Sequence, residues 1–297
     1  MNKALSQEGV NASGGVEHPP FHFDFLDVTC GTENAHAFQH GSFWFIVLTV
    51  PLVVGLWNLS ERLSAAKPVQ HLLGFDPGTL NQQVLQNVLF QLQLNFVVSH
   101  EYTHLIHGHL GACPAGQNGV WTEFGANTAS GGIDLQVQEL DADGYAIYLG
   151  LAYFLHGDLR HRALTVLNRD KLTYLDAEQM LMTCFFFVIM AFFCYLWRGA
   201  IDVSSVYRFT HPPPPIRIKN AIQIARMWCG QNESLPPSWF DEPRFRPLFS
   251  AVAELMPGPS KQTWDAPMTF LQSQEGRFYE KQLFDAFDVV RTGRTNE

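Results

Sequence analysis

The chain has 297 residues, of which 46% are apolar and only 16% are charged, and its formal net charge is −9. A charged fraction below the ~25% usual for soluble domains indicates membrane contact or an unusually large buried surface. The negative balance argues against a nucleic-acid-binding protein, because few basic side chains are available to neutralise a row of phosphates.

Residues 1–34 are predicted to be a flexible N-terminal tail, because the first twenty residues offer little apolar surface to bury. No basic segment followed by an apolar core occurs in the first forty residues, so no cleavable signal peptide is expected. Five scattered cysteines without a CxxC pair argue against a disulfide framework and favour a reducing compartment.

Residues 35–60 contain no Asp, Glu, Lys or Arg, and their centre, residues 43–57, is almost wholly apolar. We expect an apolar helix here, either a membrane span with tryptophans at the interface or a buried core helix, which Pro51 favours. If the segment spans, Arg62 and Lys67 behind it and acidic residues before it place the following domain in the cytoplasm.

A metallopeptidase domain is predicted for residues 79–230, followed by a C-terminal extension, residues 231–297, to which no function is assigned. Apolar residues recur three and four apart over residues 79–110, which predicts one long helix, with Gly111 placed to stop it. Residues 111–132 are rich in Gly, Ala, Asn and Thr and indicate a loop or a short strand. Helical signal returns from about Leu135.

A second apolar run, residues 179–197, has nineteen residues without a charge and is by length the better membrane candidate. A single crossing would separate the histidines before it from His211 after it, so that they could not serve one site. We therefore expect a helix that is buried in the core or dips into the membrane without crossing it.

The stretch FVVSHEYTHLIHGHL carries the HExxH pattern. His100 and His104 stand four apart, so on a helix they share a face and two ring nitrogens can converge on one ion, with Glu101 beside them as general base. The metzincin pattern is excluded, because His107 and Leu110 occupy the positions where it requires Gly and His.

The expected third ligand is a carboxylate on a following helix, and QELDADGYA supplies Glu139. Asp143, one turn further along, is expected to accept the outer N–H of a ligand histidine. The alternative is an acidic first turn of an ordinary helix. His107 is a competing ligand or, more in keeping with its position, lines the pocket one turn beyond the ion. His109 is expected to point away from the site, as a surface or capping histidine near the C-terminal end of the helix.

Three motifs in order, HExxH, Glu139 to Asp143, and THPPPPIRI with His211 and Arg217, resemble those of the zinc endopeptidases typified by the bacterial heat-shock protease HtpX and the CAAX prenyl protease. The phage-exclusion protease Lit and its relatives are an alternative branch of similar length. The resemblance implies that His211 donates a hydrogen bond to the developing oxyanion and that Arg217 buttresses the site. Otherwise His211 merely begins a helix and Arg217 lies at the surface.

Together these features predict a mainly α-helical protein with a zincin-like core, a small β-sheet or none, and one Zn²⁺ ion held by His100, His104 and Glu139. The expected activity is hydrolysis of peptide bonds in a protein or peptide substrate by a metal-activated water, with Glu101 as general base. The expected location is a membrane with the catalytic domain on the cytoplasmic side, or else the soluble cytoplasm. Alternatives are a zinc-stabilised membrane scaffold without turnover and an interaction protein whose histidines are incidental.

Overall fold

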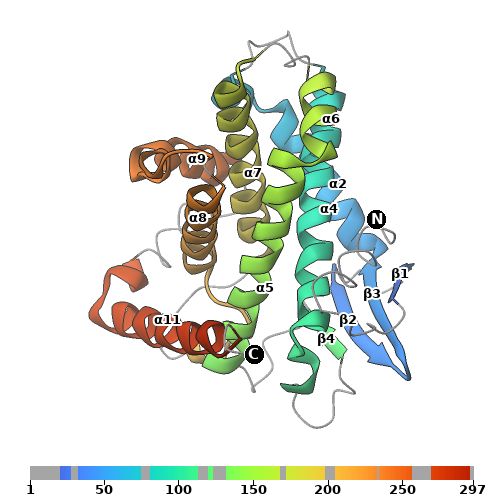
Figure 1. Ribbon diagram of the computed structural model, residues 1–297, viewed down its shortest axis with the longest axis vertical. Coiled ribbons are helices and arrows are strands. Elements are labelled where there is room, and N and C mark those ends of the chain that lie inside the picture. Colours follow the sequence, from blue (N-terminus) through green and yellow to red (C-terminus); the bar gives the residue numbers. More distant parts are fainter. Residues whose placement is uncertain are drawn as a thin grey trace.

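The structure of the chain is a computed structural model, and it is mainly helical with one small sheet (Figure 1). The residues that it describes are 21–27, 33–74, 81–112, 120–122, 132–167, 172–197, 205–232, 234–255 and 269–294. The helical elements are α2 (Val50–Ala65), α3 (Lys67–Leu72), α4 (Gln82–Ile106), η1 (His109–Ala112), α5 (Ile133–Leu151), η2 (Ala152–His156), α6 (Asp158–Val166), α7 (Tyr174–Leu196), η3 (Val206–Arg208), α8 (Pro214–Gln231), η4 (Pro237–Phe240), α9 (Glu242–Leu255) and α11 (Gln274–Arg294).

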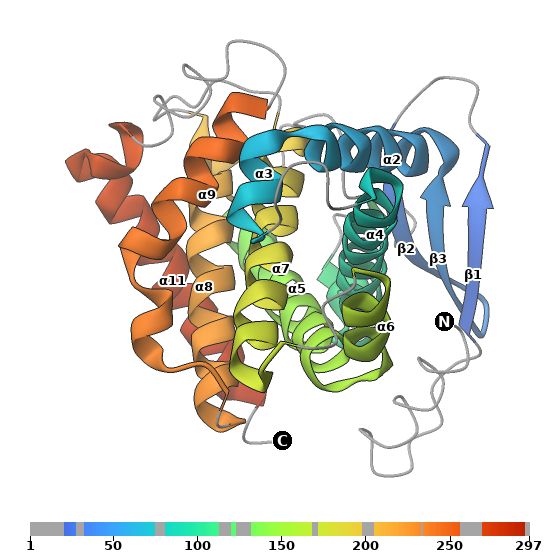
Figure 2. The ribbon, with the colours of Figure 1, turned by 90° about the horizontal axis from the view of Figure 1, so that it is seen from above.

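The helices form a bundle with the sheet along one side (Figure 2). Helix α4 lies between the sheet and α5, and α7 lies on the far side of α4 from the sheet. Helices α8, α9 and α11 cover the side of the bundle opposite the sheet. Helices α4 and α5 pack along each other, and α5 also contacts α8 and α11. Residues from α4, α5, α7, α8 and α9 share one large apolar core.

The sheet has four strands in the order β1 (Phe21–Leu26), β3 (Phe43–Thr49), β2 (Ala35–His40) and β4 (Val120–Thr122). Strand β1 runs parallel to β3, whereas β2 is antiparallel to both β3 and β4. A two-residue turn that begins at Gly41, with φ of 59°, joins β2 to β3. Positive φ at this position suits a tight hairpin and favours glycine.

This sheet corrects two predictions about the N-terminal part. Residues 35–49 are strands and not helix, and residues 21–26 of the predicted tail form a paired strand. The alternation along β2, where Ala35 and Ala37 are fully buried between more exposed neighbours, is the period of a strand with one buried face. In residues 35–49 the absence of charge therefore belongs to a partly buried sheet, whereas residues 50–60 are helical, as predicted, in α2.

Of the two alternatives for residues 35–60, a membrane span or a buried core helix, the structure favours the second for the part that is helical. Helix α2 has sixteen residues, begins at a Thr49 cap whose hydroxyl accepts from the backbone N–H of Leu52, and buries only one face. Its other face exposes Val54 and Trp57. Within the described residues, one helix is long and apolar enough to cross a membrane, and it is α7.

Helix α7 is packed among the other helices, and 78% of its most apolar window is buried inside the protein. The Phe186 ring contacts those of Trp239, Phe240 and Phe245 from η4 and α9. The same burial raises the pKa of the Cys184 thiol on α7 to about 12, so this cysteine stays protonated and unreactive. Helix α9 of the predicted C-terminal extension thus belongs to the core, because it packs on α7.

We expect Phe186→Ala to lower the free energy of unfolding by about 3–5 kcal/mol, because truncating a buried phenylalanine leaves a cavity. Chemical denaturation in buffer without detergent measures this loss. The matched control, Phe278→Ala, truncates a ring that is 60% exposed on α11 and is expected to change stability by less than about 0.5 kcal/mol. Equal losses in the two variants, or a wild-type protein that stays dispersed only in detergent, would contradict a core position of α7.

Candidate metal centre

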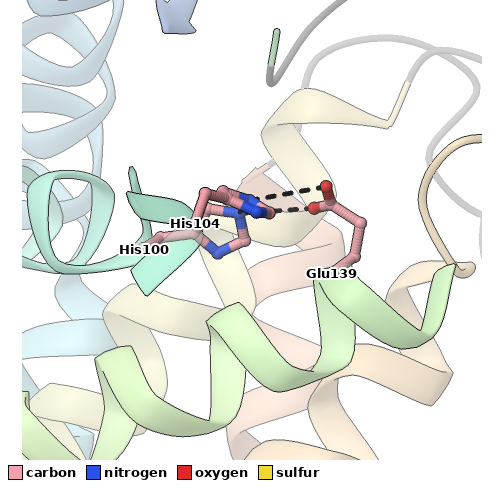
Figure 3. Close-up of side chains that lie close together, drawn as sticks. All are labelled: His100, His104 and Glu139. Carbon is pink, nitrogen blue, oxygen red and sulfur yellow. Dashed lines mark hydrogen bonds and ion pairs between the residues drawn. The ribbon is translucent and has the colours of Figure 1, made fainter. Parts of the chain in front are cut away.

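Helix α4 presents two histidines one turn apart on the face that meets α5. Asn81 caps the start of the helix by accepting from the backbone N–H of Gln83, and the helix ends at Ile106, earlier than the predicted stop at Gly111. His100 and His104 lie in its last two turns and are at most 1% exposed. Their Nε2 atoms are 3.0 Å apart, so both rings direct the same nitrogen to one point (Figure 3).

Helix α5 supplies the carboxylate that faces this pair. The Oε2 atom of Glu139 lies 3.3 Å from Nε2 of His100, and its Oε1 lies 3.6 Å from Nε2 of His104 (Figure 3). With metal–ligand bonds of about 2.1 Å, ligand atoms of a tetrahedral ion lie roughly 3.4 Å apart, close to these separations. The three buried side chains form a group whose ligand atoms all lie within 4.8 Å of one another and could hold a metal ion.

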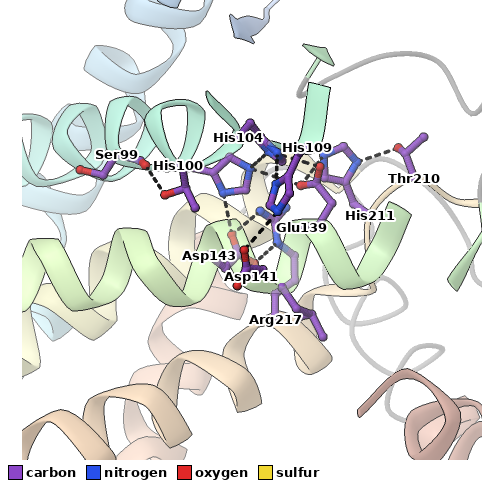
Figure 4. Close-up of polar contacts among 12 residues, drawn as sticks. Ser99, His100, His104, His109, Glu139, Asp141, Asp143, Thr210, His211 and Arg217 are labelled. Atoms are coloured by element: carbon purple, nitrogen blue, oxygen red, sulfur yellow. Dashed lines mark hydrogen bonds and ion pairs between the residues drawn. The ribbon is translucent and has the colours of Figure 1, made fainter. Parts of the chain in front are cut away.

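A second chain of contacts fixes the orientation of His100. Its Nδ1 lies 3.0 Å from Oδ1 of Asp143, and Arg217 of α8 donates to both oxygens of that carboxylate at 2.7 Å (Figure 4). The guanidinium also lies over the Phe193 ring, 4.3 Å from its centroid. Because Asp143 accepts the Nδ1 proton, Nε2 keeps a lone pair for a metal ion. The predicted residues Asp143 and Arg217 are therefore both buried in the site.

His211 approaches the carboxylate from the segment that leads into α8. Its Nε2 lies 3.1 Å from Oε2 of Glu139, and its Nδ1 lies 2.7 Å from the Thr210 hydroxyl (Figure 4). Among the described residues, His211 does not belong to the group of ligand atoms that all lie within 4.8 Å of one another. The structure thus brings His211 to the edge of the group, with 15% of its side chain exposed.

The segment before His211 is held by a glutamine that the sequence did not single out. Gln136, one turn before Glu139 on α5, donates to the carbonyl oxygens of Val206 at 2.8 Å and Phe209 at 2.9 Å. Its own amide oxygen accepts from the Tyr279 hydroxyl of α11. Burial raises the pKa of Tyr279, so its hydroxyl remains a donor. Helix α11 is in this way connected to the site.

Glu101 follows His100 on α4 and is fully buried. In the HExxH pattern, the general base is the glutamate that directly follows the first ligand histidine, and Glu101 has this position. An ionised carboxylate at this depth needs compensation by a cation or by hydrogen bonds, and a divalent ion held by the adjacent histidines would supply it.

Beyond α4 the chain turns back toward the pair, which the sequence analysis missed. Gly108 has a φ of 72°, and the chain continues into η1, which begins with His109. His109 is only 3% exposed and contacts His104, so the predicted surface position is wrong. His107 is half-buried and contacts Asp141 of α5. His107, His109 and Asp141 form a second group of candidate ligands.

Comparisons of the chain with models of protein families, with curated proteins and with solved structures found no match. The geometry of the side chains therefore carries the functional argument alone.

We expect Arg217→Met to lower the free energy of unfolding of the metal-free protein by about 3–5 kcal/mol, because it leaves the Asp143 carboxylate buried without its bidentate partner. Denaturant unfolding in the presence of a chelator measures this loss. The double variant Asp143→Asn/Arg217→Met removes both charges and is expected to recover part of the stability. A loss below about 1 kcal/mol in the single variant would show that the pair is not the structural support of the site.

Proposed function

We propose that the protein is a zinc-dependent metalloendopeptidase with a zincin-like core. The observation that carries this proposal is the convergence of His100 and His104 of α4 with Glu139 of α5, thirty-five residues after His104, at separations that suit one metal ion. The family resemblance named the same three residues from the sequence. Asp143 and Arg217 behind His100 add the outer support that such sites need.

The donor set favours zinc over other common ions. Two imidazole nitrogens and one carboxylate oxygen suit zinc, whereas magnesium and calcium prefer oxygen ligands throughout. Structural zinc sites usually have four protein ligands, and catalytic sites have three with one position open. His211 lies beside the group and outside its mutual 4.8 Å range, which supports three ligands and an open fourth position.

A zinc ion in this site would supply a Lewis acid that polarises the substrate carbonyl and makes a water molecule more acidic. Glu101 would accept the proton of the attacking water and pass it to the leaving amine. His211 would donate from Nε2 to the oxygen on which negative charge develops. The contact of Nδ1 with Thr210 favours this tautomer, because the hydroxyl can donate to Nδ1 and leave the proton on Nε2.

The proposed substrate is a protein or peptide bound in an extended conformation. Strand β4 is at the end of the sheet order, next to β2, and lies in sequence between the HExxH helix and α5. An edge strand can add an extended peptide through backbone hydrogen bonds. Residues 111–132 could also serve as a lid or an edge strand for the substrate, and most of them lie outside the described residues, so this role stays a prediction.

A second candidate function is a metal-stabilised scaffold without turnover. The observation that favours it is burial, because His100, Glu101, His104 and Glu139 are each at most 1% exposed. A structural ion needs no access for substrate, whereas an enzyme must admit a peptide to the ion. The partial exposure of His211 at the rim of the group favours access from that side and thus the enzyme.

Membrane association with a cytoplasmic catalytic domain stays a prediction. The sidedness argument assumed that residues 35–60 span the bilayer, and these residues form two strands and the start of a sixteen-residue helix. Helix α7 is apolar enough to span, but its burial inside the protein supports a core helix. The soluble alternative therefore gains support.

We expect Glu101→Gln to retain one zinc ion per chain and to lower kcat by about 10²–10⁴-fold, because the variant keeps the ligands but loses the proton acceptor. Metal analysis and cleavage of an unfolded protein substrate such as casein measure the two effects. The matched control is Glu61→Gln, an exposed position on α2 that should leave both unchanged. Wild-type cleavage by Glu101→Gln would remove Glu101 from the mechanism, and a wild-type protein that holds zinc without cleaving any peptide would favour the scaffold.

The variant His211→Leu distinguishes two roles of His211, a hydrogen-bond donor to the oxyanion and a fourth metal ligand. We expect unchanged zinc content and a kcat that is lower by about 10²–10³-fold, because a donor to the developing charge is lost. His161→Leu, an exposed histidine on α6, is the control. Loss of zinc from His211→Leu would instead make His211 a ligand and would close the position that the mechanism needs open.

A further inference from the structure

The group formed by His107, His109 and Asp141 lies next to the metal centre and meets the same ligand-distance test. The three side chains are therefore either a second metal site or a hydrogen-bonded network that holds the ligands of the first site in place. Its separations differ from those of the first group. Nδ1 of His107 is 2.6 Å and Nε2 of His109 is 3.1 Å from the same oxygen, Oδ2 of Asp141.

These separations are those of direct hydrogen bonds. A nitrogen and an oxygen 2.6 Å apart are joined by a hydrogen bond, whereas two ligand atoms of one tetrahedral ion lie roughly 3.4 Å apart. The ligand atoms of the first group stand 3.0, 3.3 and 3.6 Å apart, which leaves room for an ion between them, whereas the 2.6 Å between His107 and Asp141 is too short for two ligands of one ion. Geometry thus favours hydrogen bonding for the second group.

The contact between the two groups leads to the same conclusion by a separate argument. Nδ1 of His104 lies 2.8 Å from Nδ1 of His109 (Figure 4). Two ring nitrogens at this distance require one N–H and one lone pair. If His104 binds a metal through Nε2, its Nδ1 carries the proton and donates it to His109.

The tautomer of His109 follows from that of His104. A neutral His109 that accepts at Nδ1 carries its proton on Nε2, and this N–H points to the Asp141 carboxylate at 3.1 Å. No lone pair is then left on His109 for a second ion. The side chains of His104, His109 and Asp141 thus form one series of hydrogen bonds. Its donors and acceptors match when a single metal ion is bound by His100, His104 and Glu139.

We infer that His109 and Asp141 are positioning residues that hold His104 in its metal-binding tautomer, as Asp143 and Arg217 do for His100. This inference rests on metal binding in the proposed function but not on proteolysis. Asp141 is 12% exposed, so its carboxylate can remain ionised at the outer end of the chain, while His109 is buried beside the ligand. Each ligand histidine is then supported by an aspartate of α5, directly or through a second ring.

The test is the zinc affinity of purified protein, measured without substrate by competition with a chromophoric chelator. Wild type is expected to bind one ion. His109→Leu removes the acceptor and is expected to weaken binding by about 10–100-fold, the usual effect of losing an outer partner. His109→Asn places an amide oxygen where Nδ1 stood and is expected to recover much of the affinity. Asp141→Asn is expected to weaken binding in the same direction as His109→Leu.

His107→Ala is the variant that separates the two alternatives. His107 reaches the network through Asp141, so its loss should leave one ion bound at near wild-type affinity. Two ions in wild type, with one lost in both His107→Ala and Asp141→Asn, would overturn the inference in favour of a second metal site. One ion with unchanged affinity in His109→Leu would overturn it while leaving the proposed function intact. A wild-type protein without stoichiometric zinc would overturn the proposed function and this inference with it.

Discussion

The packing of α4 against α5 is the contact on which the site depends. It removes two imidazoles and a carboxylate from water and places them against each other, within a core that is otherwise apolar. Polar groups buried in this way destabilise a fold unless they have partners. A cation held between His100, His104 and Glu139 would satisfy all three at once, and such a requirement would explain why costly side chains occur on the inner faces of two core helices.

Helix α5 provides three carboxylates of this arrangement at alternate positions. Glu139 faces both ligand histidines, Asp143 is one turn further on behind His100, and Asp141 lies between them in sequence and reaches the region beyond the end of α4. Two of these acids are fully buried, while Asp141 retains some exposure. From the sequence alone, these three acids could also be the solvated start of an ordinary helix. In the structure, each of them contacts a histidine of α4 or of the turn that follows α4.

The sequence predicted the part of the site that depends on helical periodicity and failed where the chain turns. The four-residue spacings of His100 to His104 and of Glu139 to Asp143 survive in any helix, so the structure brings these residues together as expected. His109 was misplaced because Gly108, with φ of 72°, reverses the chain and no helical angle applies beyond it. Strands 35–49 were missed because an uncharged segment was interpreted by its length, although its alternation of buried and exposed residues has a period of two.

The C-terminal helix has a part in the site that its sequence does not suggest. Tyr279 donates to Gln136, and Gln136 donates to two carbonyl groups of the segment that ends at His211. The same region forms a second apolar cluster in which side chains of α5, α8 and α11 pack together. His211 follows the short helix η3 after two non-helical residues and is itself followed by prolines, which have no backbone N–H to donate. Its position beside Glu139 therefore depends on contacts from α5 and α11, so that a helix more than sixty residues later in the sequence helps to place this imidazole.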